Sequence, residues 1–114
     1  MIQDFKYSYD KENDDLFLYL NGSKSKGSIE LGNFVLDIDE NNSLVGMQIF
    51  EASQVLSKIL SNLAELTNIQ SIRIETNNFR NMRAIKILLT TSSGKSEGVI
   101  ALPDLNFESP ALSY

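Results

Sequence analysis

Short apolar runs separated by turn-forming polar segments occupy residues 9–53, and this alternation limits what the chain can fold into. Within the runs, apolar residues recur at every second position, which is the period of a β-strand. The segments between them are rich in Asp, Asn, Gly and Ser, which favour chain reversals. The pattern predicts an antiparallel meander.

Five strands of this meander are predicted in residues 1–50. They cover residues 5–9, 15–21, 28–31, 34–39 and 44–50. Asn41 and Asn42 suit a hairpin turn, because Asn tolerates the positive φ that tight turns require. Gly46 interrupts the alternation of the fifth strand, which indicates a bulge or the close approach of another element.

The apolar period changes from two to 3.6 at Ala52. We expect an amphipathic helix over residues 52–67, packed on the sheet, with Ser53 as its N-cap. Three further strands are predicted in residues 69–102 and an irregular tail in residues 103–114. The predicted fold is a single α+β domain, with a predominantly antiparallel sheet of about eight strands and one helix.

Neither Cys nor His occurs among the 114 residues. Disulfides, thiolate nucleophiles, imidazole bases and Cys or His zinc ligands are therefore excluded. Only carboxylates, lysines and hydroxyls remain for chemistry, so we expect no enzyme activity and no cofactor. Because no apolar run approaches the length of a membrane span, we expect a cytoplasmic protein without membrane contact.

The net charge of −5 argues against nucleic-acid binding, which depends on clustered Lys and Arg. The charge is uneven, with 5 basic and 11 acidic residues in 1–67 but 5 basic and 4 acidic in 68–114. One basic cluster consists of Arg73, Arg80, Arg83 and Lys86. We expect it to pair with the acidic first half, within the fold or across a subunit contact, since it lacks interleaved aromatic residues.

Four carboxylates fall within residues 10–15, and hard cations such as calcium bind oxygen clusters of this kind. They are Asp10, Glu12, Asp14 and Asp15. A solvated turn is the alternative, because tight turns also select Asp. Asp37 and Asp39, on one face of a predicted strand, form a second candidate pair for a cation or for acid–base chemistry.

Phe17 and Tyr19 form the candidate interface of this chain. They share one face of the second predicted strand, while leucines occupy the other face, so neither face suits water. An uncovered aromatic face marks a partner surface, and burial under the last three strands is the alternative.

Residues 16–31 and 87–102 show an internal similarity. Residues 24–31 are identical to residues 95–102 at five of eight positions. The two alternatives are a duplicated strand–loop–strand unit and a chance similarity between turn-rich segments.

Two stretches of the chain, in this order, resemble a known family. The first reads Tyr9-Asp10-x-Glu12-x-Asp14-x-Leu16-Phe17-Leu18-x-Leu20, and the second reads Val35-x-Asp37-x-Asp39, then Leu44-Val45-Gly46-Met47-x-Ile49 and Ala52-Ser53. Over about residues 7–53 they resemble small prokaryotic domains of unknown function, which carry Gly in the hairpin turn where this chain has Asn41-Asn42. The resemblance implies a compact β-rich domain with no established activity, and short members of the family lie beside small toxin genes.

These observations together predict a small non-catalytic protein-interaction domain that forms homo-oligomers. One alternative is a carboxylate-based protein that binds a divalent cation, or a hydrolase of that kind. Another is an acidic, antitoxin-like partner of a small toxin.

Overall fold

The computed structural model describes residues 2–60, 66–79 and 82–103, which form one antiparallel sheet, one helix and one short 3₁₀ turn. The strands are β1 (Ile2–Asp10), β2 (Asp15–Tyr19), β3 (Gly27–Leu31), β4 (Phe34–Ile38), β5 (Leu44–Ile49), β6 (Ile69–Phe79), β7 (Met82–Thr91) and β8 (Gly94–Pro103). The helix is α1 (Ala52–Ile59), and η1 (Leu66–Asn68) is the 3₁₀ turn. The predicted fold class is confirmed, although the protein is mostly β.

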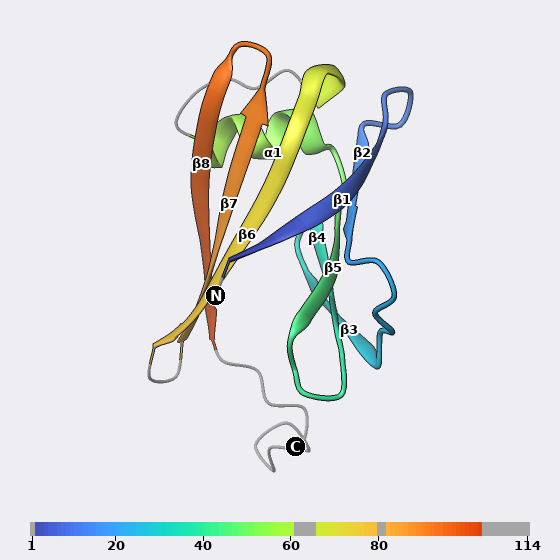
Figure 1. Ribbon diagram of the computed structural model, residues 1–114, viewed down its shortest axis with the longest axis vertical. Helices are drawn as coiled ribbons and strands as arrows, with labels where there is room; N and C mark the ends of the chain where they lie inside the picture. The colour runs from blue at the N-terminus through green and yellow to red at the C-terminus, as the bar shows by residue number, and fades with distance from the viewer. Residues whose placement is uncertain (1, 61–65, 80–81, 104–114) are drawn as a thin grey trace.

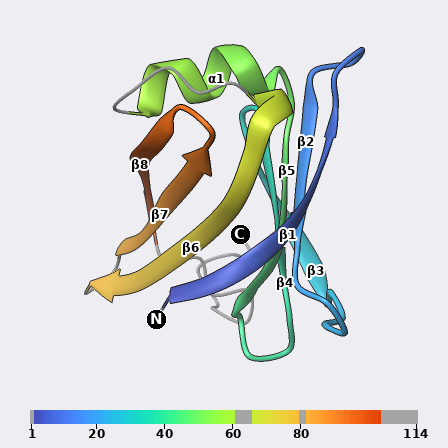
Figure 2. The same ribbon diagram turned by 45° about the horizontal axis from the view of Figure 1, so that its top comes forward.

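The sheet curls into a half-barrel with the strand order β3-β4-β5-β2-β1-β6-β7-β8 (Figure 1). The long strand β1 makes the bend, because its first residues pair with β6 and its last residues pair with β2. One wall therefore contains β3, β4, β5 and β2, and the other contains β6, β7 and β8. Helix α1 lies across one end of the concave side (Figure 2).

The concave side of the sheet holds the hydrophobic core. Side chains alternate across each strand, so every second residue of the two walls faces inward. The largest fully buried side chains come from both walls: Leu16, Leu36, Met47, Ile49, Ile72, Ile74, Ile85, Ile87 and Leu89. Helix α1 adds Ala52 and Leu56 to the same cluster, so the two walls share one core.

The predicted helix over residues 52–67 is too long. Helix α1 ends at Ile59, because Leu60 takes an extended conformation and turns its side chain into the core. Residues 61–65 lie outside the described residues, and Leu66–Asn68 form a 3₁₀ turn. The predicted N-cap is also wrong, since Glu51 occupies that position and Ser53 is already in the helix.

The prediction of a simple meander in residues 1–50 is wrong as well. Strand β5 pairs with β2, so β4 and β5 separate β2 from β3. The burial of the strands explains this order: β5 is almost entirely buried and belongs inside the sheet, whereas the short, exposed β3 suits an edge. The similar segments 16–31 and 87–102 consequently differ in topology, because β7 and β8 are paired and β2 and β3 are not.

Two local predictions are confirmed. Asn42 has a φ of 60° in the turn between β4 and β5. At Gly46 the pairing with β4 shifts register, as a bulge requires, and Asp37 approaches so closely that its Oδ2 lies 3.0 Å from the position of a Cβ. The predicted tail falls largely on residues 104–114, which lie outside the described residues. Within the described part of the chain, no helix has the length and apolar character needed to cross a membrane.

Candidate functional site

Phe17 and Tyr19 lie side by side on the outer surface of β2, and we call them the aromatic face. Their neighbours Leu16 and Leu18 point into the core, so strand alternation forces the two aromatic rings outward. Phe17 is 37% exposed and Tyr19 is 43% exposed, and the last three strands do not cover them.

Oppositely charged residues flank the aromatic face. Lys6 of β1 is paired with Tyr19 on one side, and Gly46 of β5 is paired with Tyr19 on the other. Beyond Gly46 comes Asp37 of β4, whose Oδ1 accepts a 2.6 Å hydrogen bond from the Ser28 hydroxyl. Within the described residues, neither the Lys6 ammonium nor Asp37 Oδ2 takes part in an ion pair.

Asp14 is one of the four carboxylates of residues 10–15 that were considered for cation binding. It binds the first turn of α1. Its Oδ1 accepts hydrogen bonds from the Tyr9 hydroxyl at 2.6 Å and the Ser53 amide at 3.0 Å, and its Oδ2 accepts one from the Ser53 hydroxyl at 2.7 Å. The hydrogen bond to Asp14, together with burial and nearby negative charge, raises the pKa of Tyr9 to about 12. Asp14 therefore serves the helix and the turn between β1 and β2.

Asp10 closes that same turn on itself. Its carboxylate accepts hydrogen bonds from the Asn13 side chain at 2.7 Å and from the Glu12 amide at 3.1 Å, and these bonds lower the pKa of Asp10. Among the described residues, no three or more acidic side chains are grouped so that they could hold a metal ion. This geometry corresponds to the solvated-turn alternative for residues 10–15.

Asp37 and Asp39 do not share one site. Asp37 projects from the outer surface of β4 beside Gly46. Asp39 lies just past the end of β4, where its Oδ1 accepts the amides of Asn41 at 2.8 Å and Ser43 at 3.0 Å. Asp39 thus shapes the turn between β4 and β5.

The predicted basic cluster is dispersed. Arg73 pairs with Asp4 at 3.2 Å, which links the basic second half to the acidic first half as expected. Lys86 pairs with Glu97 at 3.5 Å on neighbouring strands. Both pairs are solvent-exposed and contribute little to stability. Arg83 lies in a pocket, and Arg80 falls outside the described residues.

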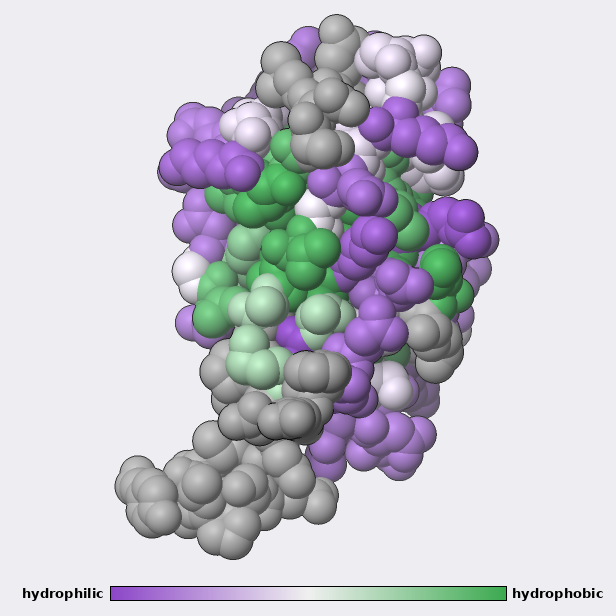
Figure 3. All heavy atoms as spheres, turned by 90° about the vertical axis from the view of Figure 1, so that its left-hand side faces the viewer, coloured by the Kyte–Doolittle hydropathy of each residue, from purple (hydrophilic) through white to green (hydrophobic). Residues whose placement is uncertain are grey.

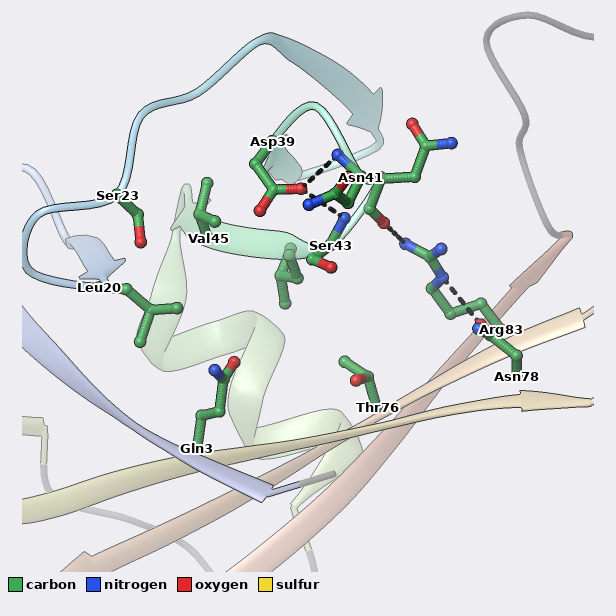
Figure 4. Close-up of a pocket in the computed structure, with 12 residues that line it drawn as sticks. Gln3, Leu20, Ser23, Asp39, Asn41, Ser43, Val45, Thr76, Asn78 and Arg83 are labelled. Carbon is green, nitrogen blue, oxygen red and sulfur yellow. Dashed lines mark hydrogen bonds between the residues drawn. The ribbon is translucent and has the colours of Figure 1, made fainter.

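That pocket has a volume of about 380 Å³ (Figure 4). It is lined by the turn between β4 and β5, which lies at the end of the half-barrel opposite α1 (Figure 1). The turn between β4 and β5, together with the segment that follows β2, forms one wall, and β1, β6 and β7 form the other. Arg83 joins these walls, because its Nη1 donates to the Asn42 carbonyl oxygen at 2.8 Å and its Nε donates to Asn78 Oδ1 at 3.1 Å. The remaining lining residues are Gln3, Leu20, Ser23, Asp39, Asn41, Ser43, Leu44, Val45 and Thr76.

The pocket was not predicted from the sequence, although the strand alternation contains a signal for it. Residues two positions apart on a strand face the same side of the sheet. Three polar residues of the lining each lie two positions from a buried residue of the same strand, and therefore face the concave side: Gln3 (from Phe5), Thr76 (from Ile74) and Arg83 (from Ile85). Three neighbouring strands therefore place polar residues at inward-facing positions at the same end of the sheet. Only the strand order shows that these positions are adjacent.

An exposed apolar patch lies on the β8 side of the molecule (Figure 3). Among the described residues of β7 and β8, the exposed large apolar side chains include Val99 of β8, at 54%, and Met82 of β7. Val99 is paired with Lys86, whose ammonium already binds Glu97 within the chain.

Comparisons with known proteins find similarity over less than half of the chain. The chain is 42% identical over 52 residues to an uncharacterized protein of Methanocaldococcus jannaschii, covering 46% of this chain and 45% of that protein. It is also 42% identical over 48 residues to a Methanosarcina mazei protein named "Putative hypoxanthine phosphoribosyltransferase", covering 42% of this chain and 39% of that protein. The match thus spans less than half the length of either relative. No solved structure matches.

The family comparison covers residues 6–53, which run from β1 to the start of α1. This segment contains the aromatic face, the Asp14 contacts with α1 and the β4–β5 wall of the pocket. It agrees with the resemblance over about residues 7–53. Over residues 6–53 the chain is similar to the family described as "Protein of unknown function (DUF2283)".

Proposed function

We propose that this protein is a non-catalytic interaction domain that pairs with a second copy of itself through the aromatic face. The observation that supports this proposal is the order of residues across the outer surface of the sheet. Lys6, Tyr19, Gly46 and Asp37 form one row across β1, β2, β5 and β4. The positively charged Lys6 and the negatively charged Asp37 therefore lie at opposite ends of the row, with Tyr19 and Gly46 between them.

Such a row is complementary to itself. When two sheets stack face to face about a two-fold axis between β2 and β5, parallel to the strands, β1 of each copy lies over β4 of the other. Lys6 of one copy then faces Asp37 of the second copy, and the contact occurs twice. Each Tyr19 lies over a Gly46 position, where no side chain opposes it.

The two parts of this surface have different roles. Phe17 and Tyr19 supply apolar area, because aromatic side chains contribute most of the contact energy in protein interfaces. Lys6 and Asp37 fix the orientation, since opposite charges select a register and like charges in contact cost several kcal/mol. The apolar surface near Val99 offers no such pair of opposite charges to a second copy, because Lys86 and Glu97 already form an ion pair within the chain.

The first test is the solution mass of the protein, measured by light scattering coupled to size exclusion. We expect a dimer for the wild type and a folded monomer for Tyr19→Glu, because the substitution buries a charge in the apolar contact. Val99→Glu is the matched control on the other exposed apolar surface and should leave the dimer intact. A monomeric wild type at high concentration would contradict the proposal.

A charge exchange tests the register of the two copies. Lys6→Glu and Asp37→Lys should each weaken the dimer by at least about tenfold, because each creates two contacts between like charges. The double variant restores opposite charges and should recover most of the wild-type affinity. If the double variant is as weak as the single variants, Lys6 does not face Asp37 of the second copy.

A further inference from the structure

We propose that the pocket between the β4–β5 turn and strands β1, β6 and β7 binds a neutral, hydroxyl-rich small molecule of about the size of a monosaccharide. This activity is separate from self-association, because the pocket lies on the concave side and the aromatic face lies on the outer surface. Gln3, Thr76 and Arg83 lie on the concave side of the sheet, at the open end of the half-barrel beyond the apolar core. Thr76 and Arg83 are half-buried, and Gln3 is exposed at the rim of the pocket.

Contacts within the chain hold both walls of the pocket in place. Arg83 connects the Asn42 carbonyl oxygen of one wall with Asn78 of the other. Asp39 Oδ1 accepts two amides of the β4–β5 turn, which fixes the backbone of that turn. A ligand would therefore meet a pocket that is largely formed, so little ordering would oppose its binding.

Other polar groups of the lining are not used by these contacts. Within the described residues, the side chains of Gln3, Ser23 and Ser43 and the second oxygen of Asp39 have no hydrogen-bond partner. Figure 4 shows Gln3 projecting from one wall and Ser23 and Asp39 from the other, toward the same space. These groups surround the space in which a ligand would sit.

Their chemistry matches hydroxyl groups. An amide or a serine hydroxyl both donates and accepts hydrogen bonds, and a carboxylate oxygen accepts only. A ligand hydroxyl likewise donates and accepts, so adjacent hydroxyls can satisfy all of these groups together. Leu20 and Val45 offer an apolar surface for the C–H groups of the same ligand.

Charge favours a neutral ligand over an ion. The pocket contains one guanidinium, Arg83, and one carboxylate, Asp39, so it has no net charge of its own. The chain as a whole carries −5, which disfavours anions. A cation would find only one carboxylate and would face Arg83.

The experiment is an NMR titration of the ¹⁵N-labelled full chain with D-glucose and, separately, with glucose 6-phosphate. We expect saturable shifts with glucose at the amides of Gln3, Ser23, Asp39 and Ser43, with a Kd in the millimolar range. Glucose 6-phosphate should bind at least threefold more weakly, because the net charge of −5 on the chain disfavours an anion. No saturable shift at these amides, or tighter binding of the phosphate, would overturn the proposal.

Paired variants locate the site. Ser23→Ala with Ser43→Ala removes two hydroxyls from the pocket and should weaken glucose binding about tenfold. Ser8→Ala makes the same chemical change on the outer surface of β1 and should leave the affinity unchanged. Because all of these serines are exposed, the spectrum of each variant should remain that of the folded protein. Equal affinities for wild type and the double variant would place the sugar elsewhere and refute the assignment.

Discussion

Asp14 shows how much one side chain contributes to this fold. It has a left-handed backbone with a φ of 56°, which Asp and Asn adopt more readily than other non-glycine residues. Its backbone oxygen accepts the Ala52 amide at 2.8 Å, and its carboxylate binds Ser53 and Tyr9. Asp14 lies 38 positions before Ala52 in the sequence and still caps the first turn of α1. Ser53 cannot be the N-cap, because it already lies within the helix.

The substitution Asp14→Asn tests this cap while it keeps the shape and the left-handed turn. We expect the free energy of unfolding at pH 7 to fall by about 1 kcal/mol, because hydrogen bonds to a charged carboxylate are stronger than those to a neutral amide. Chemical denaturation measures the loss, and Asp10→Asn in the same turn is the control. If both variants lose the same stability, Asp14 has no special role at the helix.

The same variant should also change the pH dependence of stability. Burial raises the pKa of Asp14, but the hydrogen bonds from Tyr9 and Ser53 outweigh burial and hold the pKa below 3.8. A carboxyl whose pKa is lowered by folding stabilises the protein above its unfolded value, and that contribution is lost as the pH falls through the folded value. The stability difference between wild type and Asp14→Asn should therefore narrow below about pH 3.8. A constant difference down to pH 2 would contradict the hydrogen-bond account.

The contact between α1 and β8 requires glycine at position 98, because glycine has no side chain. A Cβ at Gly98 would lie 2.4 Å from the Ile59 carbonyl oxygen and 2.9 Å from its carbonyl carbon. Both are backbone atoms at the end of the helix, so they cannot move aside as a flexible side chain does. Only glycine at this position allows α1 to end against β8.

Gly98→Ala should therefore destabilise the protein by about 2–3 kcal/mol, the cost of overpacking a well-packed contact. Thermal unfolding followed by circular dichroism measures the change. Gly27→Ala is the matched control, because its Cβ meets no atom within 4 Å and should change stability by less than about 0.5 kcal/mol. Similar losses in the two variants would mean that the close approach is not what makes Gly98 necessary.

The elements differ in how far local pattern predicts them. The alternation of apolar and polar residues, together with turn-forming residues, predicts strands such as β2 and β4. These signals are local, because the side of a strand that a side chain faces depends only on its position along that strand. The end of α1 depends on Gly98, which is 39 positions after Ile59, and the place of β5 beside β2 depends on burial across the sheet. The aromatic face was found because Phe17 and Tyr19 are adjacent on one strand. The pocket was missed because Gln3, Thr76 and Arg83 meet only after β1, β6 and β7 are assembled.

Both walls of the half-barrel share one core, although the family comparison covers only residues 6–53. Leu16 and Leu18 of β2 belong to the same buried cluster as Ile74 of β6 and Ile87 of β7. Strand β1 pairs with both walls, so the walls cannot separate unless the hydrogen bonds between β1 and one of them are broken. The described fold should consequently unfold as one cooperative unit.

Ile87→Ala tests this cooperativity from the second half of the chain. Three of the four tyrosines lie in β1 and β2, so tyrosine fluorescence reports mainly on the first half, whereas far-ultraviolet circular dichroism reports on all strands. We expect both signals to give one shared transition in urea, moved to lower urea by a loss of roughly 2–5 kcal/mol. Val99→Ala, on the exposed patch, should shift neither signal appreciably. If Ile87→Ala moved the circular dichroism transition but left the tyrosine transition in place, the two walls would fold independently, and the shared core would not couple the family segment to β6–β8.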